Sequence, residues 1–245
     1  MTQTAHNTTP TALVTGASRG LGHALATGLA QRGWRLIIDG RDRATLDAAT
    51  TALARATVVT ALCGDVGDPR HRAALASAVH AAGRLDLLVN NASTLGPSPL
   101  PSLASVDEQT LADVYRVNAI APLLLFQAVR DALETVDGTV INVTSDAAGG
   151  AWPGWGVYGS SKAALEQLTG VLGSEHPSLA VYAVDPGDMR TDMHQVAFPG
   201  DDISDRPEPA TVVPAILSLV DRRPASGRYR AAELPWDPAG DLVGS

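Results

Sequence analysis

The fold is decided by the stretch from Ala12 to Gly22, which reads ALVTGASRGLG. An aliphatic run leads straight into a turn with three glycines, and Leu21, Leu25 and Leu29 then recur every four residues, as on one helix face. Glycine lets such a turn approach a pyrophosphate, which backbone N–H groups and the helix N-terminus attract. The spacing is G-x-x-x-G-x-G, and an ordinary tight turn is the alternative. The flanking strand and amphipathic helix favour a dinucleotide site.

Aliphatic or β-branched runs alternate with Ala- and Leu-rich helical stretches along the rest of the chain. This alternation is typical of parallel strands joined by crossover helices. We therefore predict an α/β fold: a doubly wound, Rossmann-type parallel sheet of about seven strands with helices on both faces. The longest expected helix, 107–134, contains Pro122, whose missing N–H should bend or break it. The expected strands are 12–15, 35–39, 57–62, 85–90, 139–144, 179–184 and 228–233.

The 245 residues contain no internal repeat and no linker rich in Pro, Gly and Ser, which predicts a single domain over 1–245. Within it, the irregular segment 188–209 is expected to be a substrate lid over a site at the strand ends. Hydrophobic residues at 45% and charged residues at 18% exclude a disordered chain. The 26 acidic and 18 basic side chains give a net charge of −8, which predicts no nucleic-acid and no membrane partner.

Cysteine usage and the first ten residues predict a cytoplasmic protein. Cys63 is the only cysteine, so no internal disulfide can form, and MTQTAHNTTP lacks the basic and apolar regions of a signal peptide. The longest apolar run, from Ala119 to Ala128, is far shorter than the roughly 18 to 20 residues that span a bilayer. We expect it to form a buried helix.

A second motif, YGSSK, runs from Tyr158 to Lys162. Residues four apart on a helix share a face, so the Lys162 ammonium can lie near the Tyr158 phenol. A nearby cation should lower the tyrosine pKa and make the phenol a usable proton donor and acceptor. The alternative is a surface pair of no consequence. Against it, Lys162 is the only lysine in a chain with 17 arginines, which suggests a position that requires a compact ammonium.

Ser145 ends the expected fifth strand, thirteen residues before Tyr158. Its hydroxyl can reach the same crevice and hydrogen-bond a carbonyl oxygen, whereas a helix cap or turn serine is the alternative. Together with the glycine turn, these residues resemble the short, single-domain branch of the short-chain dehydrogenase/reductase family. Further landmarks of that family follow in order: Asp65-Val66, Asn90-Asn91-Ala92-Ser93, Asn118, and Pro186-Gly187 with Thr191.

The resemblance implies an oxidoreductase that transfers a hydride between a nicotinamide and a carbonyl or alcohol substrate. It implies proton transfer by Tyr158, polarisation of the substrate oxygen by Ser145, and a water relay supported by Asn118. It also implies that Lys162 tunes Tyr158 and binds the nicotinamide ribose. The cofactor-binding residues it implies are Gly16, Ser18, Arg19, Gly20, Leu21, Gly22, Arg41, Asp65, Val66, Asn91, Ala92, Tyr158, Lys162, Pro186, Gly187, Met189 and Thr191.

The end of the second strand bears on the choice of cofactor. An acid there holds the ribose hydroxyls of NAD, whereas an arginine accommodates the 2′-phosphate of NADP. By the family's spacing the acid position falls at Gly40 and the arginine position at Arg41, with Arg19 as a second cation. We therefore predict NADP (NADPH) rather than NAD. Asp39 is the counterargument, because a slip of one residue would put its carboxylate at the ribose.

Few residues in the sequence indicate the class of substrate. Trp152 and Trp155 either wall a pocket or pack against neighbouring helices or a partner subunit. No metal is predicted, because His194 has no companions at metal-ligand spacing. Side chains of the expected lid suggest an apolar, sizeable substrate: Met189, Met193, His194 and Phe198.

The chain departs from the family pattern in two places. Ser93 stands where glycine is usual and is expected to alter the backbone approach to the nicotinamide half. The tail from Pro235 to Ser245 lacks the family's usual ending, so the family's C-terminal subunit contacts are not expected to carry over. The resemblance and the apolar run Leu123 to Phe126 predict a homodimer or homotetramer built across two-fold axes. A non-catalytic NADP-binding sensor is the alternative function, whose expected signature is loss of the tyrosine or the lysine.

Overall fold

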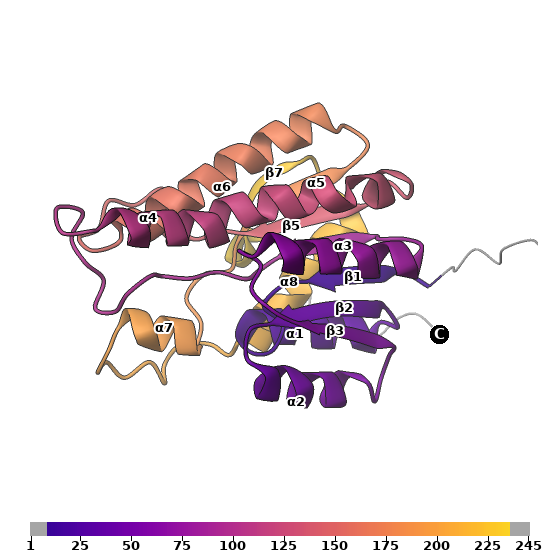
Figure 1. The fold of residues 1–245 in the computed structure, drawn as a ribbon, viewed down its shortest axis with the longest axis horizontal. Helices are drawn as coiled ribbons and strands as arrows, with labels where there is room; N and C mark the ends of the chain where they lie inside the picture. Colours follow the sequence, from indigo (N-terminus) through magenta and orange to yellow (C-terminus); the bar gives the residue numbers. More distant parts are fainter. Residues whose placement is uncertain (1–8, 236–245) are drawn as a thin grey trace, which may run out of the picture.

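A seven-stranded parallel sheet forms the centre of the computed structural model, which describes residues 9–235 (Figure 1). The strand order is β3-β2-β1-β4-β5-β6-β7, so the direction in which strands are added reverses between β1 and β4. The predicted doubly wound Rossmann-type α/β fold is confirmed. The strands are β1 (Thr11–Val14), β2 (Arg35–Gly40), β3 (Val59–Cys63), β4 (Leu87–Asn90), β5 (Thr139–Val143), β6 (Ala180–Asp185) and β7 (Gly227–Arg230).

Helices cover both faces of the sheet because both faces are apolar. Successive side chains of β1 point to opposite faces, so Ala12 and Val14 join one core cluster and Leu13 joins the other. The first cluster is covered by α1 (Gly20–Gln31), α2 (Arg43–Leu53) and α8 (Val213–Arg222). The second is covered by α3 (Pro69–Ala82), α5 (Ala121–Glu134) and α6 (Gly156–Glu175).

The long helix expected over 107–134 is interrupted just before Pro122. It begins as α4 (Glu108–Tyr115), which the Asp107 carboxylate caps by accepting the Thr110 N–H at 2.7 Å. A π-helical segment, Arg116–Ile120, separates α4 from α5. Proline has no N–H for the carbonyl four residues earlier, which fits a wider turn at this point. Asn118 lies inside this segment.

The expected strand 228–233 was wrong beyond Arg230, where the chain turns into the short helix Ala231–Glu233. The Arg230 guanidinium donates to the Glu233 carboxylate at 3.4 Å across this turn, and Ala231 is buried in the core. The other predicted strands differ from the observed ones by at most two residues at either end.

The apolar surface expected from Leu123 to Phe126 is smaller than predicted. Leu125 and Phe126 are fully buried within the subunit, and of the run only Leu124 is strongly exposed. The reason is the helical period, which turns successive residues to different sides of α5.

The expected lid region lies between β6 and α8 and contains one helix, α7 (Asp192–Ala197), which stands apart from the layered body (Figure 1). The Thr191 hydroxyl caps α7 by accepting the His194 N–H at 3.1 Å, and Ser98 donates to the Val196 carbonyl at 2.8 Å. In the described part of the chain no helix is long and apolar enough to cross a membrane. Residues 1–8 and 236–245, which include most of the two terminal stretches used above, lie outside the described residues.

Candidate active site

The predicted site residues converge at the carboxyl edge of the sheet. The glycine turn follows β1, Arg41 follows β2 and the Asp65-Val66 pair follows β3. On the other side of the point where the strand order reverses, the Asn91 loop follows β4, and Ser145 and Pro186 follow β5 and β6. Ligands of doubly wound sheets bind at this reversal point.

The glycine turn presents bare backbone to this crevice. Gly16 and Gly20 have φ angles of +65° and +57°, a region that favours glycine. Asn91 holds the turn from the neighbouring loop, because its Nδ2 donates to the carbonyls of Thr15 at 2.9 Å and Gly16 at 3.2 Å. A Cβ at Gly22 would overlap both Asn91 and the Gly16 carbonyl, so no larger residue fits at the start of α1.

Asp39 is buried beneath this turn rather than turned out of the end of β2. Its Oδ1 accepts the Gly16 N–H at 2.6 Å and its Oδ2 accepts from His71 Nε2 at 3.0 Å. A Cβ on Gly40 would lie 2.9 Å from Cβ of Ser18, which leaves no room for an acidic side chain there. Arg41, the predicted ligand of a 2′-phosphate, is exposed. This geometry does not support the slip that would bring the Asp39 carboxylate to the ribose.

Tyr158 and Lys162 share one face of α6, as their spacing predicts. The Lys162 Nζ lies 5.6 Å from the centroid of the Tyr158 ring and donates to the Val143 carbonyl at 2.7 Å. Lys162 is fully buried, and within residues 9–235 it forms no ion pair with a carboxylate. Burial lowers the pKa of Lys162 to about 7.

The expectation that Lys162 lowers the pKa of Tyr158 was wrong for the chain by itself. Burial raises the Tyr158 pKa to about 12, and this outweighs the lowering effect of hydrogen bonds with Ser145 and Ser93. The physical reason is that both groups are desolvated together: the lysine loses most of its tendency to be charged, and the phenol loses the water that would stabilise a phenolate.

Two serine hydroxyls act on the Tyr158 hydroxyl. Ser145 lowers the pKa of Tyr158, donates to the Asp146 carboxylate at 3.0 Å and caps the short helix Asp146–Ala148 by accepting the Ala147 N–H at 3.1 Å. Both of its predicted roles, the reactive hydroxyl and the helix cap, are therefore compatible. Ser93 also lowers the pKa of Tyr158, and its hydroxyl donates to Asn118 Oδ1 at 3.0 Å.

Both the oxygen and the nitrogen of the Asn118 side-chain amide form hydrogen bonds within the protein. Besides the Ser93 bond, Oδ1 accepts the Thr94 N–H at 2.9 Å, and Nδ2 donates to the Thr94 carbonyl at 2.8 Å and to Ser161 at 3.0 Å. Asn118 therefore joins the π-helical segment to the β4 loop and to α6. The departure at Ser93 adds a side-chain hydrogen bond to Asn118, an effect that the expectation about the backbone did not include.

The remaining predicted cofactor residues line the same edge with different exposure. Val66 is buried against Val117 of the π-helical segment, while the Asp65 carboxylate accepts the Gly67 N–H at 2.7 Å. Met189 is buried in the core, and Gly187 is exposed. The Thr191 methyl would lie 3.7 Å from a Cβ on Gly20, so the β6 loop lies over the glycine turn.

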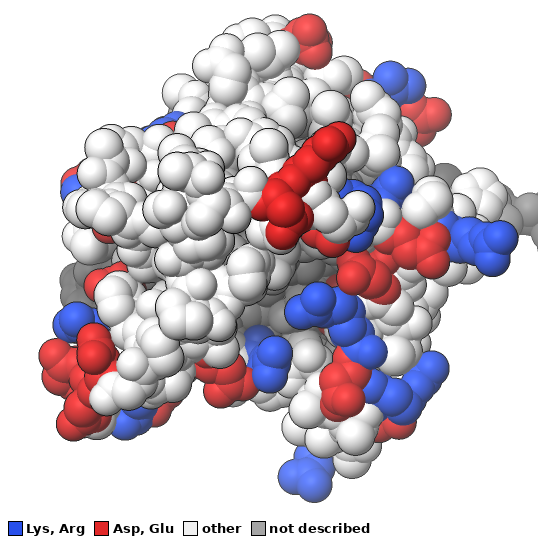
Figure 2. Space-filling view, turned by 60° about the vertical axis from the view of Figure 1, so that its left-hand side comes forward, with Lys and Arg blue, Asp and Glu red and all other residues white. Residues whose placement is uncertain are grey.

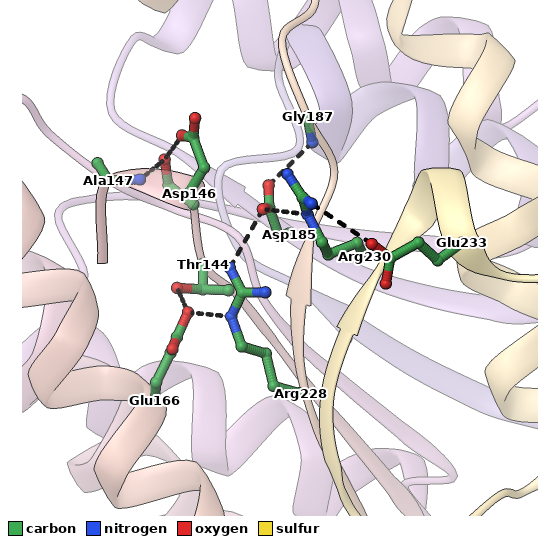
Figure 3. Close-up of polar contacts among 10 residues, drawn as sticks. Thr144, Asp146, Ala147, Glu166, Asp185, Gly187, Arg228, Arg230 and Glu233 are labelled. Atoms are coloured by element: carbon green, nitrogen blue, oxygen red, sulfur yellow. Dashed lines mark hydrogen bonds and ion pairs between the residues drawn. The ribbon is translucent and has the colours of Figure 1, made fainter. Parts of the chain in front are cut away.

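A polar network fixes the β6 loop behind the site (Figure 3). The Asp185 carboxylate, which is buried, accepts the Gly187 N–H at 3.0 Å and an Arg228 N–H at 3.2 Å. Arg228 also donates to Glu166 of α6 at 2.8 Å, and Glu166 accepts from Thr144 at 2.8 Å. This network connects the loop that follows β6 with the helix of Tyr158 and with the residue before Ser145.

Aromatic rings form one side of the site. The ring of Trp155 lies 5.8 Å from the Tyr158 ring and 5.8 Å from the Phe198 ring, centroid to centroid. The His194 ring lies 4.9 Å from the Phe198 ring and is tilted against it by 41°. Of its two predicted roles, the pocket wall fits Trp155 better, because its ring contacts both Tyr158 and Phe198 at the end of α7. Trp152 is half-exposed and covers Gly150. Among residues 9–235, no group of three potential ligands could hold a metal ion.

Charges of both signs border the recess that Figure 2 shows on the side of α4 and α7. Arg19, which was predicted to help bind a phosphate, forms an ion pair with Asp192 of α7 at 2.9 Å, and both side chains are exposed. The predicted phosphate ligand and the expected lid are therefore in contact.

Sequence reasoning missed His71 and the network around Asp185. His71 shares a helix face with Leu75 and Val79 at four-residue spacing, which could have shown that it is buried. Its partner Asp39 is 32 residues away, and no local spacing connects the two. The Arg228–Asp185 contact likewise joins residues 43 positions apart.

The comparisons with known proteins agree with this geometry. The family model described as short chain dehydrogenase matches residues 10–202. An uncharacterised oxidoreductase of Mycobacterium tuberculosis is 34% identical over 237 residues, covering 95% of this chain and 87% of the relative. A short-chain dehydrogenase of Shigella flexneri, solved in complex with NADP, has a TM-score of 0.83 and 29% identity, covering 91% of this chain and 97% of that one. One from Escherichia coli, solved with NADPH, has a TM-score of 0.80 and 30% identity, covering 91% and 96%.

Proposed function

This chain belongs to the short-chain dehydrogenase/reductase family, and from that premise we propose that it is an NADP(H)-dependent oxidoreductase acting on a carbonyl or alcohol substrate. The observation that carries the proposal is the buried Tyr158, which has the Lys162 ammonium 5.6 Å from its ring centroid and Ser145 as a group that lowers its pKa. A non-catalytic sensor would not need this constellation.

The nucleotide half of the site fits an NADP-type cofactor. Its glycine turn is bare backbone at a helix N-terminus, which suits a pyrophosphate. At the end of β2 there is no space for an acid at Gly40, and Arg41 supplies an exposed cation that suits a 2′-phosphate. The two structural neighbours solved with NADP and NADPH support the same choice. The residues that would hold the cofactor are those of the glycine turn, Arg41, the loops after β3, β4 and β6, and Tyr158 with Lys162.

A bound nicotinamide supplies the hydride that is exchanged with the carbonyl carbon. Tyr158, protonated at neutral pH because its pKa is about 12, donates its proton to the substrate oxygen during reduction. Ser145 donates a hydrogen bond to the same oxygen. Lys162, with a pKa of about 7, takes up and releases a proton near neutral pH and can restore the one that Tyr158 gives away. Asn118 positions α6 through Ser161.

In the cofactor-free chain Tyr158 is a phenol at neutral pH, which is the form that donates a proton when a carbonyl is reduced. The aromatic wall of Trp155 and Phe198 favours an apolar substrate. A screen of ketones and quinones that follows the absorbance of NADPH tests the function. Turnover of at least one apolar carbonyl compound is expected. Tight NADPH binding with no turnover across the screen would instead favour the sensor.

We further propose that the protein forms a homodimer through the surface of α4, α5 and α6. Exposed apolar side chains on these elements and the π-helical segment support this assembly: Leu111, Ile120, Leu124 and Val171. Light scattering at micromolar concentration should give at least twice the chain mass, and a monomeric mass would exclude the assembly. A tetramer and a cytoplasmic location stay predictions.

A further inference from the structure

A buried acid lies one residue before Gly40, at the end of β2 where dinucleotide-binding folds distinguish their cofactors. Only 2% of the Asp39 side chain is exposed. Both carboxylate oxygens are engaged, one by the Gly16 N–H at 2.6 Å and the other by His71 Nε2 at 3.0 Å. Because a carboxylate only accepts, the imidazole must donate. Either a neutral ring with its proton on Nε2 or a charged ring can be the donor. The carboxylate is thereby held toward the interior.

The position of His71 is fixed independently of Asp39. It lies in the first turn of α3, which Asp68 caps by accepting the Arg70 N–H at 2.8 Å. The neighbouring Arg72, also buried, donates to the Val66 carbonyl at 2.6 Å. The imidazole ring occupies the space that a Cβ on Gly64 would need, so the end of β3 is shaped around it. His71 cannot follow the carboxylate if that group turns outward.

The second oxygen of Asp39 would be a buried acceptor with no partner if the imidazole were absent. An unsatisfied buried carboxylate oxygen is costly, so the group would seek another donor. The adenine ribose of NADH offers two hydroxyl donors, whereas the 2′-phosphate of NADPH replaces one of them with negative charge. Loss of the imidazole would therefore favour NADH and disfavour NADPH.

From this geometry we infer that His71 is a specificity-determining residue, which selects NADPH by holding Asp39 away from the ribose. The inference rests on the proposed binding of NADP(H). His71 acts together with Arg41. Arg41 attracts the 2′-phosphate, whereas His71 keeps the repulsive Asp39 carboxylate away from that phosphate.

The test is a fluorescence titration of NADPH and NADH that yields the ratio of the two Kd values for each variant. Both titrations use one protein sample, so a partly unfolded fraction cancels from the ratio. In His71→Leu the preference for NADPH should fall at least tenfold. His71→Gln, which keeps an N–H donor, should stay within about threefold of the wild type. The double variant Asp39→Asn with His71→Leu should regain most of the preference, because the charge is gone.

Leu75→Ala is the matched control, since it disturbs the buried face of the same helix without touching Asp39. Its ratio should equal that of the wild type. An unchanged ratio in His71→Leu would overturn the inference while leaving the proposed function intact, whereas a wild type that binds neither dinucleotide would overturn both. If His71→Leu does not fold, Asp39→Asn alone decides: a change below threefold supports an acid turned away from the ribose, and a tenfold gain for NADPH contradicts it.

Discussion

The two halves of the site treat their buried charged groups in opposite ways. In the nucleotide half, the Asp39 carboxylate has a donor on each oxygen. In the half that contains Tyr158, Lys162 is just as buried but donates to a neutral group, the Val143 carbonyl, and burial lowers its pKa to about 7. The first half is a satisfied, rigid cradle, whereas the second keeps an ionisable group in an environment that disfavours its charge.

This difference indicates which half of the site lowers the free energy of unfolding. A paired acid beneath the glycine turn stabilises the conformation that binds phosphate groups. A buried lysine that forms no ion pair within residues 9–235 costs folding free energy. The proposed function accounts for this cost, because it gives Lys162 the role of exchanging a proton near neutral pH. Substitutions in the two halves should therefore separate binding from turnover.

The largest effect is expected for Tyr158→Phe. The ring and its contact with Trp155 remain, but the proton donor is lost, so the rate should fall by about 100-fold to 10,000-fold. NADPH binding should be nearly unchanged. Steady-state kinetics and a fluorescence titration measure the two quantities. A variant with more than half of the wild-type rate would contradict the role given to Tyr158.

Lys162→Met should abolish turnover and yet stabilise the fold, because an apolar side chain of similar length replaces a buried amine. The lysine penalty is greatest below its folded pKa of about 7, where both folded and unfolded states carry the charge. It shrinks as pH rises toward the ordinary value of 10.5, since the unfolded lysine then also loses its proton. We expect a gain of about 1 to 3 kcal/mol at pH 7, measured by urea unfolding at several pH values.

Lys162→Arg is the companion variant, which keeps a cation but not its compact shape. It should be inactive and less stable than the wild type, because a planar guanidinium does not fit the space of the ammonium. A gap between Lys162→Met and wild type that grows with rising pH would contradict the sign argued here.

Arg41→Ala should lower the preference for NADPH over NADH by roughly tenfold, the value of one charge-assisted contact. The measurement is kcat/KM with each cofactor. Arg43→Ala is a matched control, because Arg43 is an exposed arginine two residues away that pairs with Asp47 at 3.7 Å. Equal loss of preference in both variants would mean that general charge, rather than a contact from Arg41, selects the cofactor.

The sequence predicted where Ser145, Tyr158 and Lys162 lie in the fold because the signals for their placement are local. Tyr158 and Lys162 are one helical turn apart, and Ser145 directly follows a buried strand, so spacing alone placed them on one crevice. The doubly wound parallel sheet could be predicted in the same way, since alternating apolar runs and amphipathic helices leave few parallel topologies.

Contacts between distant residues account for what the sequence could not predict. Nothing in the local pattern at Asp39 shows that its carboxylate accepts a hydrogen bond from a histidine 32 residues later. Likewise, nothing near Arg228 shows that it donates to Asp185. The pKa of Tyr158 was misjudged for a related reason: spacing gave its distance from Lys162, but burial, which decides the sign of the shift, depends on the whole fold.

The smallest effect on cofactor binding is expected at the contact between the glycine turn and the expected lid, where Arg19 pairs with Asp192 of α7. Both side chains are exposed, so the pair contributes at most about 1 kcal/mol. Asp192→Asn would release Arg19 for a phosphate and remove a negative charge near the glycine turn. NADPH should therefore bind about two- to fivefold more tightly at low salt, and the gain should fade at high salt because the charges are screened. Asp205→Asn removes the same charge from the same segment but pairs with Arg206 instead, at 3.3 Å. If it tightens binding equally, the effect comes from net charge and not from competition for Arg19.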